Sequence, residues 1–246
     1  MSGAPLPTSA FDYELPPGRI AQRPSARRDA SRLLVLARGD GRVEHRRFSD
    51  LPALIEPGDV VVLNESRVIP ARLVGRRPTG GEAEVLLVHP ATVDGAPPAA
   101  LESDPRLWLA LVRPGAKLKP GRSVTVAADL VVRIIDSTDD GARLVRLETE
   151  LPVAEALHRH GRVPLPPYIS REPTADDAVR YQTVFARAAG SVAAPTAGLH
   201  FTPALLDAIE ARGAALARLV LHVGIGTFRP VETEDPAAHR MHAEWY

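Results

Sequence analysis

A succession of short, strand-sized segments in the middle of the chain constrains its fold more than any other feature. Between Glu82 and Leu147, short runs of aliphatic and β-branched residues alternate with clusters of Gly, Pro and Asp. Short strands separated by closely spaced turn signals are typical of an antiparallel barrel or sandwich. The strands that we expect in this region are 82–88, 107–112, 123–126, 130–135 and 142–147.

Helix signals appear after Leu151. The clearest expected helix is 202–212, because Thr202 can cap it, Pro203 takes its first position and Gly213 follows its end. Further elements that we expect are helices at 153–160 and 175–188, strands at 32–37 and 216–223, and a buried strand at 59–63. We therefore predict an α/β body of residues 1–75 and 151–246, interrupted by an inserted antiparallel β-barrel domain at 76–150.

The composition excludes several classes of site. The chain contains no cysteine, which excludes disulfides, thiolate nucleophiles and thiolate metal ligands. No spacing of histidines and carboxylates indicates a metal site, so we expect none. No apolar run approaches the roughly 20 residues that span a bilayer, and the N-terminus lacks the regions of a signal peptide. We expect a cytoplasmic, monomeric protein that does not contact a membrane.

The charge balance speaks against a non-specific nucleic-acid binder. The formal net charge is zero, whereas such binders gain affinity by neutralising phosphates. Clusters of arginines, as at residues 19–32 and 67–77, still leave a local basic patch open. The alternative is that these arginines are only solvated surface residues.

Three segments carry side chains that suit ligand binding. The first, 64–73 (NESRVIPARL), directly follows the expected strand at 59–63, where α/β proteins tend to place ligand groups. Asn64 offers a donor and an acceptor, and Arg67 and Arg72 offer planar donor groups for carboxylate or phosphate. The alternative is a polar turn between strands.

The second segment, 190–202 (GSVAAPTAGLHFT), is rich in small residues and leads into the expected helix at 202–212. Backbone N–H groups at a helix start can receive an anionic ligand, and glycines such as Gly198 let a ligand approach the backbone. Ser191 and Thr196 add hydroxyls. His200 can move a proton near neutral pH, although a lone histidine is more often structural.

The third segment is 221–231 (LHVGIGTFRPV). Gly224 and Gly226 end the expected strand at 216–223, and Thr227 and Arg229 follow them. This Gly-X-Gly lacks the third glycine of a dinucleotide-binding fingerprint, so a tight turn is an alternative. His222 lies inside the strand and is as consistent with a core residue as with a ligand contact. A last motif, MHAEWY at 241–246, offers an aromatic pair that can stack on a purine or cover the edge of the core.

Taken in order, seven motifs resemble the S-adenosylmethionine:tRNA ribosyltransferase-isomerase family of queuosine biosynthesis. The resemblance runs from about Phe11 to Tyr246, and its most specific part is the twelve-residue motif that ends at Thr202. The motifs are DASRLLVL (29–36), VIPARL (68–73), LPPYI (165–169), YQTVFA (181–186), SVAAPTAGLHFT (191–202), LHVGIGTFRPV (221–231) and MHAEWY (241–246).

The resemblance implies a reaction and two substrates. Such enzymes transfer the ribosyl group of S-adenosylmethionine to 7-aminomethyl-7-deazaguanine at the wobble position of a tRNA, releasing adenine and methionine and giving epoxyqueuosine-tRNA. S-adenosylmethionine is a consumed substrate, and no cofactor is expected. The family fold is likewise an α/β domain with an inserted β-barrel.

On this resemblance we expect one substrate pocket lined by the three segments. The attacking amine must be neutral, and closing the cyclopentane removes a carbon-bound proton, so a base near neutral pKa suits both steps. We choose His200 over His222, because His200 precedes a capped helix. Arg67 and Arg72 would hold the methionine carboxylate or an RNA phosphate. The other expected contacts are Asn64, Ser191, Thr196, Gly198, His222, Gly224, Gly226, Thr227 and Arg229.

Two departures from the family pattern bear on this expectation. Glu65 stands where the family usually has asparagine or aspartate. The family also continues for about another hundred residues, with Gly-Thr-Thr-Ser-Val-Arg and Asn-Phe-His-Leu-Pro segments that are absent here. The alternative function is therefore a truncated, non-catalytic remnant that binds tRNA or S-adenosylmethionine without turnover. A generic small-molecule-binding α/β protein agrees less well with the motifs.

Overall fold

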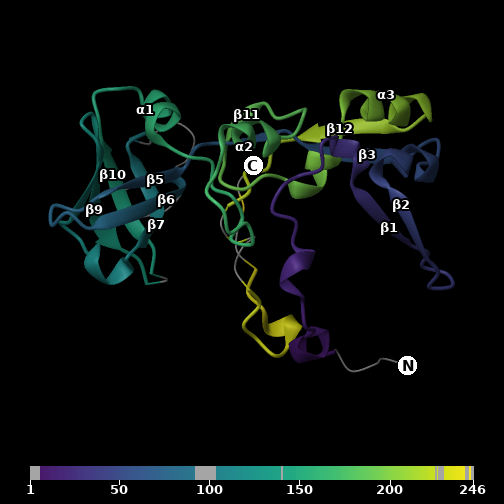
Figure 1. Cartoon of the computed structure of the whole chain (residues 1–246), viewed down its shortest axis with the longest axis horizontal. Coiled ribbons are helices and arrows are strands. Elements are labelled where there is room, and N and C mark those ends of the chain that lie inside the picture. The colour runs from purple at the N-terminus through teal and green to yellow at the C-terminus, as the bar shows by residue number, and fades with distance from the viewer. Residues whose placement is uncertain are drawn as a thin grey trace.

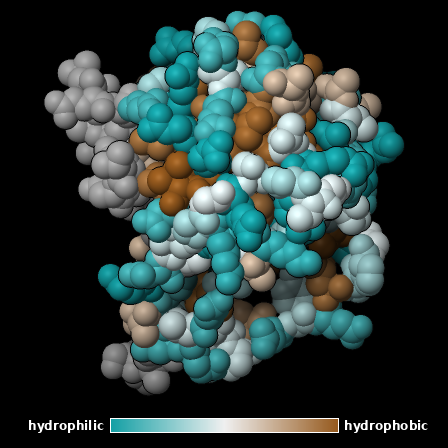
Figure 2. All heavy atoms as spheres, turned by 90° about the vertical axis from the view of Figure 1, so that its left-hand side faces the viewer, coloured by the Kyte–Doolittle hydropathy of each residue, from teal (hydrophilic) through white to brown (hydrophobic). Residues whose placement is uncertain are grey.

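A computed structural model describes residues 6–91, 104–139, 141–224, 226, 230–241 and 244. A β-barrel lies at one end of the molecule, and helix α3 (Pro203–Ala211) lies at the other (Figure 1). On the barrel end, hydrophilic side chains cover most of the surface, with hydrophobic patches between them (Figure 2). None of the helices in the described ranges has both the length and the apolar character needed to cross a membrane.

Six antiparallel strands close into the barrel, in the order β10-β7-β6-β5-β8-β9. The sequence predicts an antiparallel barrel here and five of these strands, but not β5. Alternate side chains of each strand point inward, and Leu73, Val85 and Val145 are fully buried in its core. The strands are β5 (Arg72–Arg76), β6 (Glu82–Pro90), β7 (Leu107–Arg113), β8 (Ser123–Ala127), β9 (Leu130–Ser137) and β10 (Arg143–Glu148).

Gly75 permits the closure of the barrel where β5 meets β8. The two strands are paired at Arg76 and Thr125. A Cβ on Gly75 would lie 2.4 Å from the carbonyl oxygen of Thr125, which is too close for any side chain. So close an approach of two backbones requires glycine.

Helix α1 (Val153–His160) covers the barrel and contributes Ala156 and Leu157 to the barrel core. It ends at Gly161, as predicted, and the chain then pairs back onto β5 through two backbone hydrogen bonds between Arg72 and Arg162. The barrel thus begins at Arg72, ahead of residue 76. The division of the chain into domains at residues 76 and 150 stays a prediction.

A second core forms around parallel strands β3 (Val60–Asn64) and β12 (Ala215–Leu219). Helix α3 packs Leu205, Leu206 and Ile209 against Leu63 of β3. The predicted cap is confirmed, because the Thr202 hydroxyl accepts a hydrogen bond from the N–H of Leu205 at 3.2 Å. Helix α3 and the parallel strands β3 and β12, together with the barrel, confirm the predicted fold class, an α/β body with an antiparallel β-barrel.

Two smaller strand pairs accompany these cores. Strands β1 (Arg32–Leu36) and β2 (Val43–Arg47) form an antiparallel hairpin. Strand β4 (Ser66–Val68) pairs in parallel with β11 (Ala188–Ser191). Short 3₁₀ helices connect the elements: η1 (Thr8–Phe11), η2 (Pro17–Arg19), η3 (Arg28–Ala30), η4 (Phe48–Leu54), η5 (Gly115–Lys117), η6 (Thr196–His200) and η8 (Pro236–Ala238).

The predicted helix at 175–188 is wrong in length. Helix α2 (Ala175–Arg180) has six residues; residues 181–187 form turns and irregular structure, and β11 begins at Ala188. The strand expected at 216–223 is also shorter, since β12 ends at Leu219.

The strand expected at 59–63 is present as β3, but the expectation that it is buried is wrong. Val60 and Val62 are 59% and 60% exposed. Within the described part of the chain, β12 is the one strand paired with β3, and α3 covers only one face of this pair.

Candidate functional site

The C-terminal ends of β3 and β12 meet the segment that follows β12, and Asn64 organises the junction. Its side-chain N–H₂ donates to the carbonyl oxygen of Leu221 at 2.8 Å. Its side-chain oxygen accepts from the N–H groups of Leu221 at 3.1 Å and Ser66 at 3.0 Å. Asn64 thus extends the strand pairing past the end of β12, so its polar groups hold the backbone of the expected ligand segment.

Ser66 and Ser191 lie at the same junction and are both buried. The Ser191 hydroxyl donates to the Ser66 hydroxyl at 2.8 Å and accepts from the N–H of Val223 at 2.9 Å. The carbonyl of Val223 in turn accepts from the N–H groups of Val192 and Ala193. These bonds join the beginning of the expected second segment to the middle of the third.

Glu65 carries the charge of this junction. Its carboxylate is buried and accepts from Arg187 at 2.6 Å and from Arg218 at 2.8 Å. The hydrogen bond from Arg218, followed by the charge of Arg187, lowers the pKa of Glu65 despite the opposing effect of burial. The departure from the family pattern at this position therefore places a paired anion between β11 and β12.

His222 lies against Gly190 at the edge of the junction. A Cβ on Gly190 would lie 2.5 Å from Cε1 of the His222 ring, so the contact requires glycine, and the φ of Gly190 is +151°. Nδ1 of His222 is buried and has no hydrogen-bond partner among the described residues. Burial lowers the pKa of His222 and so favours its neutral ring.

Thr196 and His200 line a different feature, a cleft of about 540 Å³. Its walls come from three parts of the chain: the N-terminal segment through η3, the proline-rich segment with α2, and η6. The ring of His200 also packs on Phe48, with 5.1 Å between the ring centroids. Other residues that line the cleft include Arg23, Arg28, Arg32, Leu165, Pro166, Ile169, Arg171, Asp177, Arg180, Tyr181 and Leu199.

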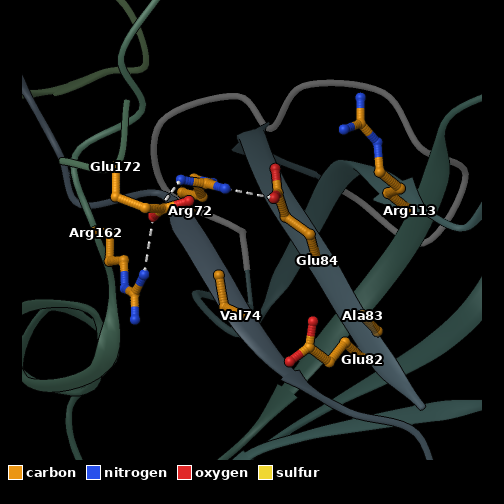
Figure 3. A pocket seen from close by; sticks show the side chains of 8 residues that line it. All are labelled: Arg72, Val74, Glu82, Ala83, Glu84, Arg113, Arg162 and Glu172. Carbon is orange, nitrogen blue, oxygen red and sulfur yellow. Dashed lines mark hydrogen bonds and ion pairs between the residues drawn. The ribbon is translucent and has the colours of Figure 1, made fainter. Parts of the chain in front are cut away.

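Arg72 lines neither place; it lies on the outside of the barrel, next to the proline-rich segment (Figure 3). Its guanidinium donates to Glu84 at 2.8 Å and to Glu172 at 3.4 Å, and Arg162 also reaches Glu172 (Figure 3). The hydrogen bond that Arg72 donates to Glu84 is the main cause of the raised pKa of Arg72. These residues line a shallow pocket of about 210 Å³. Arg72 therefore ties the barrel to the proline-rich segment.

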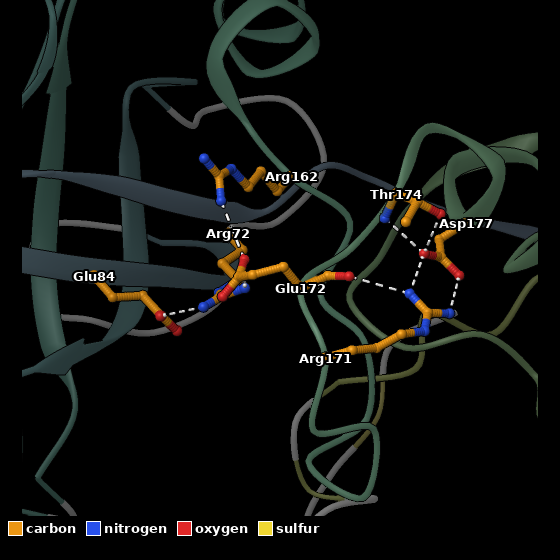
Figure 4. Close-up of polar contacts among 7 residues, drawn as sticks. All are labelled: Arg72, Glu84, Arg162, Arg171, Glu172, Thr174 and Asp177. Carbon is orange, nitrogen blue, oxygen red and sulfur yellow. Dashed lines mark hydrogen bonds and ion pairs between the residues drawn. The ribbon is translucent and has the colours of Figure 1, made fainter. Parts of the chain in front are cut away.

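Glu172 continues this polar network towards α2. Its neighbour Arg171 donates to both carboxylate oxygens of Asp177, which also accepts from the backbone and hydroxyl of Thr174 (Figure 4). Asp177 and Thr174 form a capping box at the start of α2.

The remaining predicted residues have simpler surroundings or lie outside the description. Arg67 is exposed. Gly198 packs against Thr183 and Phe185, and Gly226 is buried.

Gly224 donates its N–H to Glu244, the fourth residue of MHAEWY, at 2.6 Å. Thr227, Arg229 and most of MHAEWY lie outside the described residues. In the described ranges, no group of three or more His, Asp or Glu side chains lies close enough together to hold a metal ion.

The expected single pocket thus divides between two places. The junction holds Asn64, Ser191, His222 and Gly224, and the cleft holds Thr196 and His200. One segment links them, because residues 191–200 begin at the junction and end at the cleft. Sequence reasoning missed the contribution of residues 21–32 and of Tyr181 to the cleft, although the arginine cluster at 19–32 was a visible signal.

Comparisons with known proteins agree with the motifs. Residues 8–246 match the family model described as queuosine biosynthesis protein. The S-adenosylmethionine:tRNA ribosyltransferase-isomerase of Symbiobacterium thermophilum is 49% identical over 97% of this chain and 66% of its own length. That of Thermotoga maritima is 46% identical over 98% of this chain and 67% of its own length.

A solved structure of S-adenosylmethionine tRNA ribosyltransferase from Thermotoga maritima is 34% identical, with a TM-score of 0.33. The match covers 87% of this chain and 58% of that one. The chain spans about two thirds of the length of the curated relatives that it matches. The match to the family model and the identities to its curated relatives show that the chain belongs to the queuosine biosynthesis protein family.

Proposed function

We propose that this chain acts in tRNA modification, transferring the ribosyl group of S-adenosylmethionine to 7-aminomethyl-7-deazaguanine at the wobble position of a tRNA and giving epoxyqueuosine-tRNA. One observation carries the proposal: relatives named S-adenosylmethionine:tRNA ribosyltransferase-isomerase are 46–49% identical over nearly the whole of this chain. S-adenosylmethionine is consumed in this reaction, and no cofactor takes part.

The geometry supports a division of roles between the two places. Asn64 and Ser191 fix the backbone of Leu221 and Val223 at the ends of β3 and β12, where a small ligand can meet backbone groups. His200 lines the cleft, where it can take a proton from a bound amine or carbon acid. Arg67 is exposed and is the better candidate for a substrate anion, since Arg72 already binds Glu84 and Glu172.

The experiment measures adenine release. The purified 246-residue chain is incubated with S-adenosylmethionine and a tRNA that carries 7-aminomethyl-7-deazaguanine at the wobble position. A tRNA with unmodified guanine there is the matched control. We expect adenine and a heavier nucleoside only with the modified tRNA. Methyl transfer to the tRNA, or release of adenine without any change in the tRNA, would contradict the proposal.

Adenine release, combined with binding assays, distinguishes the enzyme from the alternative, a binding protein without turnover. A chain that binds S-adenosylmethionine in calorimetry or the tRNA in a gel-shift assay, but releases no adenine, acts as a binding protein without turnover.

A further inference from the structure

The cleft beside His200 concentrates positive charge in a chain whose formal net charge is zero. Five arginines line it, namely Arg23, Arg28, Arg32, Arg171 and Arg180, against a single carboxylate, Asp177. A cleft lined by one sign of charge focuses the field and attracts ligands of the opposite sign.

Most of this charge is not neutralised from within the protein. Arg28 donates to the backbone carbonyls of Arg180 and Leu199, at 3.2 and 3.0 Å. Arg180 donates likewise to the carbonyls of Ala26 and Ser25. Among the described residues that line the cleft, Arg171 alone is paired with a carboxylate. Arg23 and Arg32 are exposed at its mouth.

The walls of the cleft suit a flat, largely apolar group. Leu165, Pro166, Ile169 and Leu199 line it together with Tyr181, which is 7% exposed. Tyr181 also packs in a buried cluster with Val163 and Ala194, which fixes the ring as part of the apolar wall.

The segment that forms one of these walls also carries an exposed tyrosine. Tyr168 lies between Pro167 and Ile169 in the sequence and is 59% exposed. The carbonyl of Tyr168 accepts from the side chain of Gln22, another residue of the cleft, at 3.0 Å. Single-stranded nucleic acid is commonly bound by a basic groove combined with aromatic rings on which bases stack.

We propose that this cleft binds a single-stranded segment of RNA, with one base between the apolar walls, a second stacked on Tyr168, and backbone phosphates on Arg23 and Arg32. The proposal rests on the proposed function and adds the place at which the RNA substrate enters. At the arginines the charge favours RNA over S-adenosylmethionine, because that molecule carries a sulfonium and an ammonium group against one carboxylate. In the proposed function its ribosyl group still has to reach His200, which also lines the cleft.

The test is direct binding, independent of turnover. An unmodified 17-nucleotide anticodon stem-loop RNA with a fluorescent label is titrated with the 246-residue chain by anisotropy at several salt concentrations. The double variant Arg23→Glu/Arg32→Glu is compared with Arg38→Glu/Arg122→Glu, which changes the net charge equally at two exposed arginines outside the cleft. Thermal melting of each variant verifies that it is folded.

We expect the cleft variant to lose at least about tenfold in affinity, and its slope of log K against log salt to shrink by about 1.4, since each lost phosphate contact removes about 0.7. The control variant keeps the wild-type slope. Tyr168→Ala lowers the affinity about tenfold, whereas Tyr168→Phe retains it because the ring remains.

Several results would overturn the proposal. These are equal RNA affinity of the cleft and control variants, no RNA binding by the wild-type chain, or loss of S-adenosylmethionine binding in the cleft variant with RNA binding intact. If RNA binds as expected but no adenine is released, the proposed function fails while this assignment of the cleft stands.

Discussion

The hydroxyl of Ser191 at the end of β11 donates a hydrogen bond of 2.8 Å to the hydroxyl of Ser66 at the start of β4. Both side chains are buried. Ser191 also accepts from the N–H of Val223 at 2.9 Å, so one hydroxyl joins three segments that are far apart in the sequence. The junction of the candidate site depends on this residue.

Ser191→Ala should lower the free energy of unfolding by about 0.5–1.5 kcal/mol, because it removes the acceptor of the half-buried N–H of Val223. Ser66→Ala is the matched control. It removes the other hydroxyl of the pair but keeps the acceptor for Val223, so its effect should be smaller. Urea unfolding followed by circular dichroism measures both. An equal loss in the two variants would show that the bond to Val223 contributes nothing measurable.

Much of the fold follows from local sequence signals. The five expected barrel strands all occur within a few residues of their expected bounds, because turn residues and aliphatic runs alternate there without ambiguity. The helix after Thr202 was equally predictable, since cap, Pro203 and Gly213 act within a few residues of one another.

The predictions fail where contacts between residues far apart in the sequence determine the local structure. The helix expected at 175–188 ends at Arg180 and gives way to turns, and β11 then forms at 188–191 by pairing with β4, which lies far away in the sequence. The motif around Arg72 predicts a ligand contact, but Arg72 forms ion pairs with Glu84 and Glu172, which belong to two other segments. The cleft likewise combines residues 21–32 with 165–200, a pairing that no single motif contains.

Asp177 should make the stability of the protein depend on pH in the acid range. The two hydrogen bonds from Arg171, together with those from Thr174, hold the pKa of Asp177 well below its usual value despite its burial. A lowered folded-state pKa means that the unfolded chain binds the proton more readily. The stabilisation is therefore present above about pH 4, where an unfolded aspartate is ionised, and is lost as the pH falls below that value.

Asp177→Ala tests this dependence. Near pH 7 it should lower the free energy of unfolding by about 3 kcal/mol, because it leaves Arg171 and the Thr174 backbone without their partner. The difference from the wild type should shrink as the pH falls from about 4 to 3. Asp176→Ala, the exposed neighbour on α2, should change the stability by no more than about 0.5 kcal/mol. A difference for Asp177→Ala that stays constant across this pH range would contradict the argument.

Gly190→Ala should displace His222. The new methyl group would lie within 2.6 Å of the ring, and the φ of +151° disfavours any side chain at this position. We expect a loss of about 1–3 kcal/mol in the free energy of unfolding, measured by urea titration. Gly39→Ala, at an exposed position where a Cβ meets nothing within 4 Å, is the matched control and should be nearly neutral. If Gly190→Ala were as stable as the wild type, the ring of His222 would be free to move aside.

The role of His200 is best tested by separating its basicity from its packing. Its ring lines the cleft and packs on Phe48, so a loss of activity in His200→Ala alone would not distinguish proton transfer from support of the loop. His200→Phe retains an aromatic ring against Phe48 but has no nitrogen to accept a proton.

If His200 is the general base, both variants should release adenine about 10²–10⁴-fold more slowly, with RNA binding unchanged. Added imidazole should then restore part of the rate in His200→Ala, where the removed ring leaves space, and not in His200→Phe. Near-normal turnover of His200→Phe would assign His200 to packing. His222 would then be the histidine to test by the same pair of substitutions, because burial lowers its pKa and favours the neutral ring.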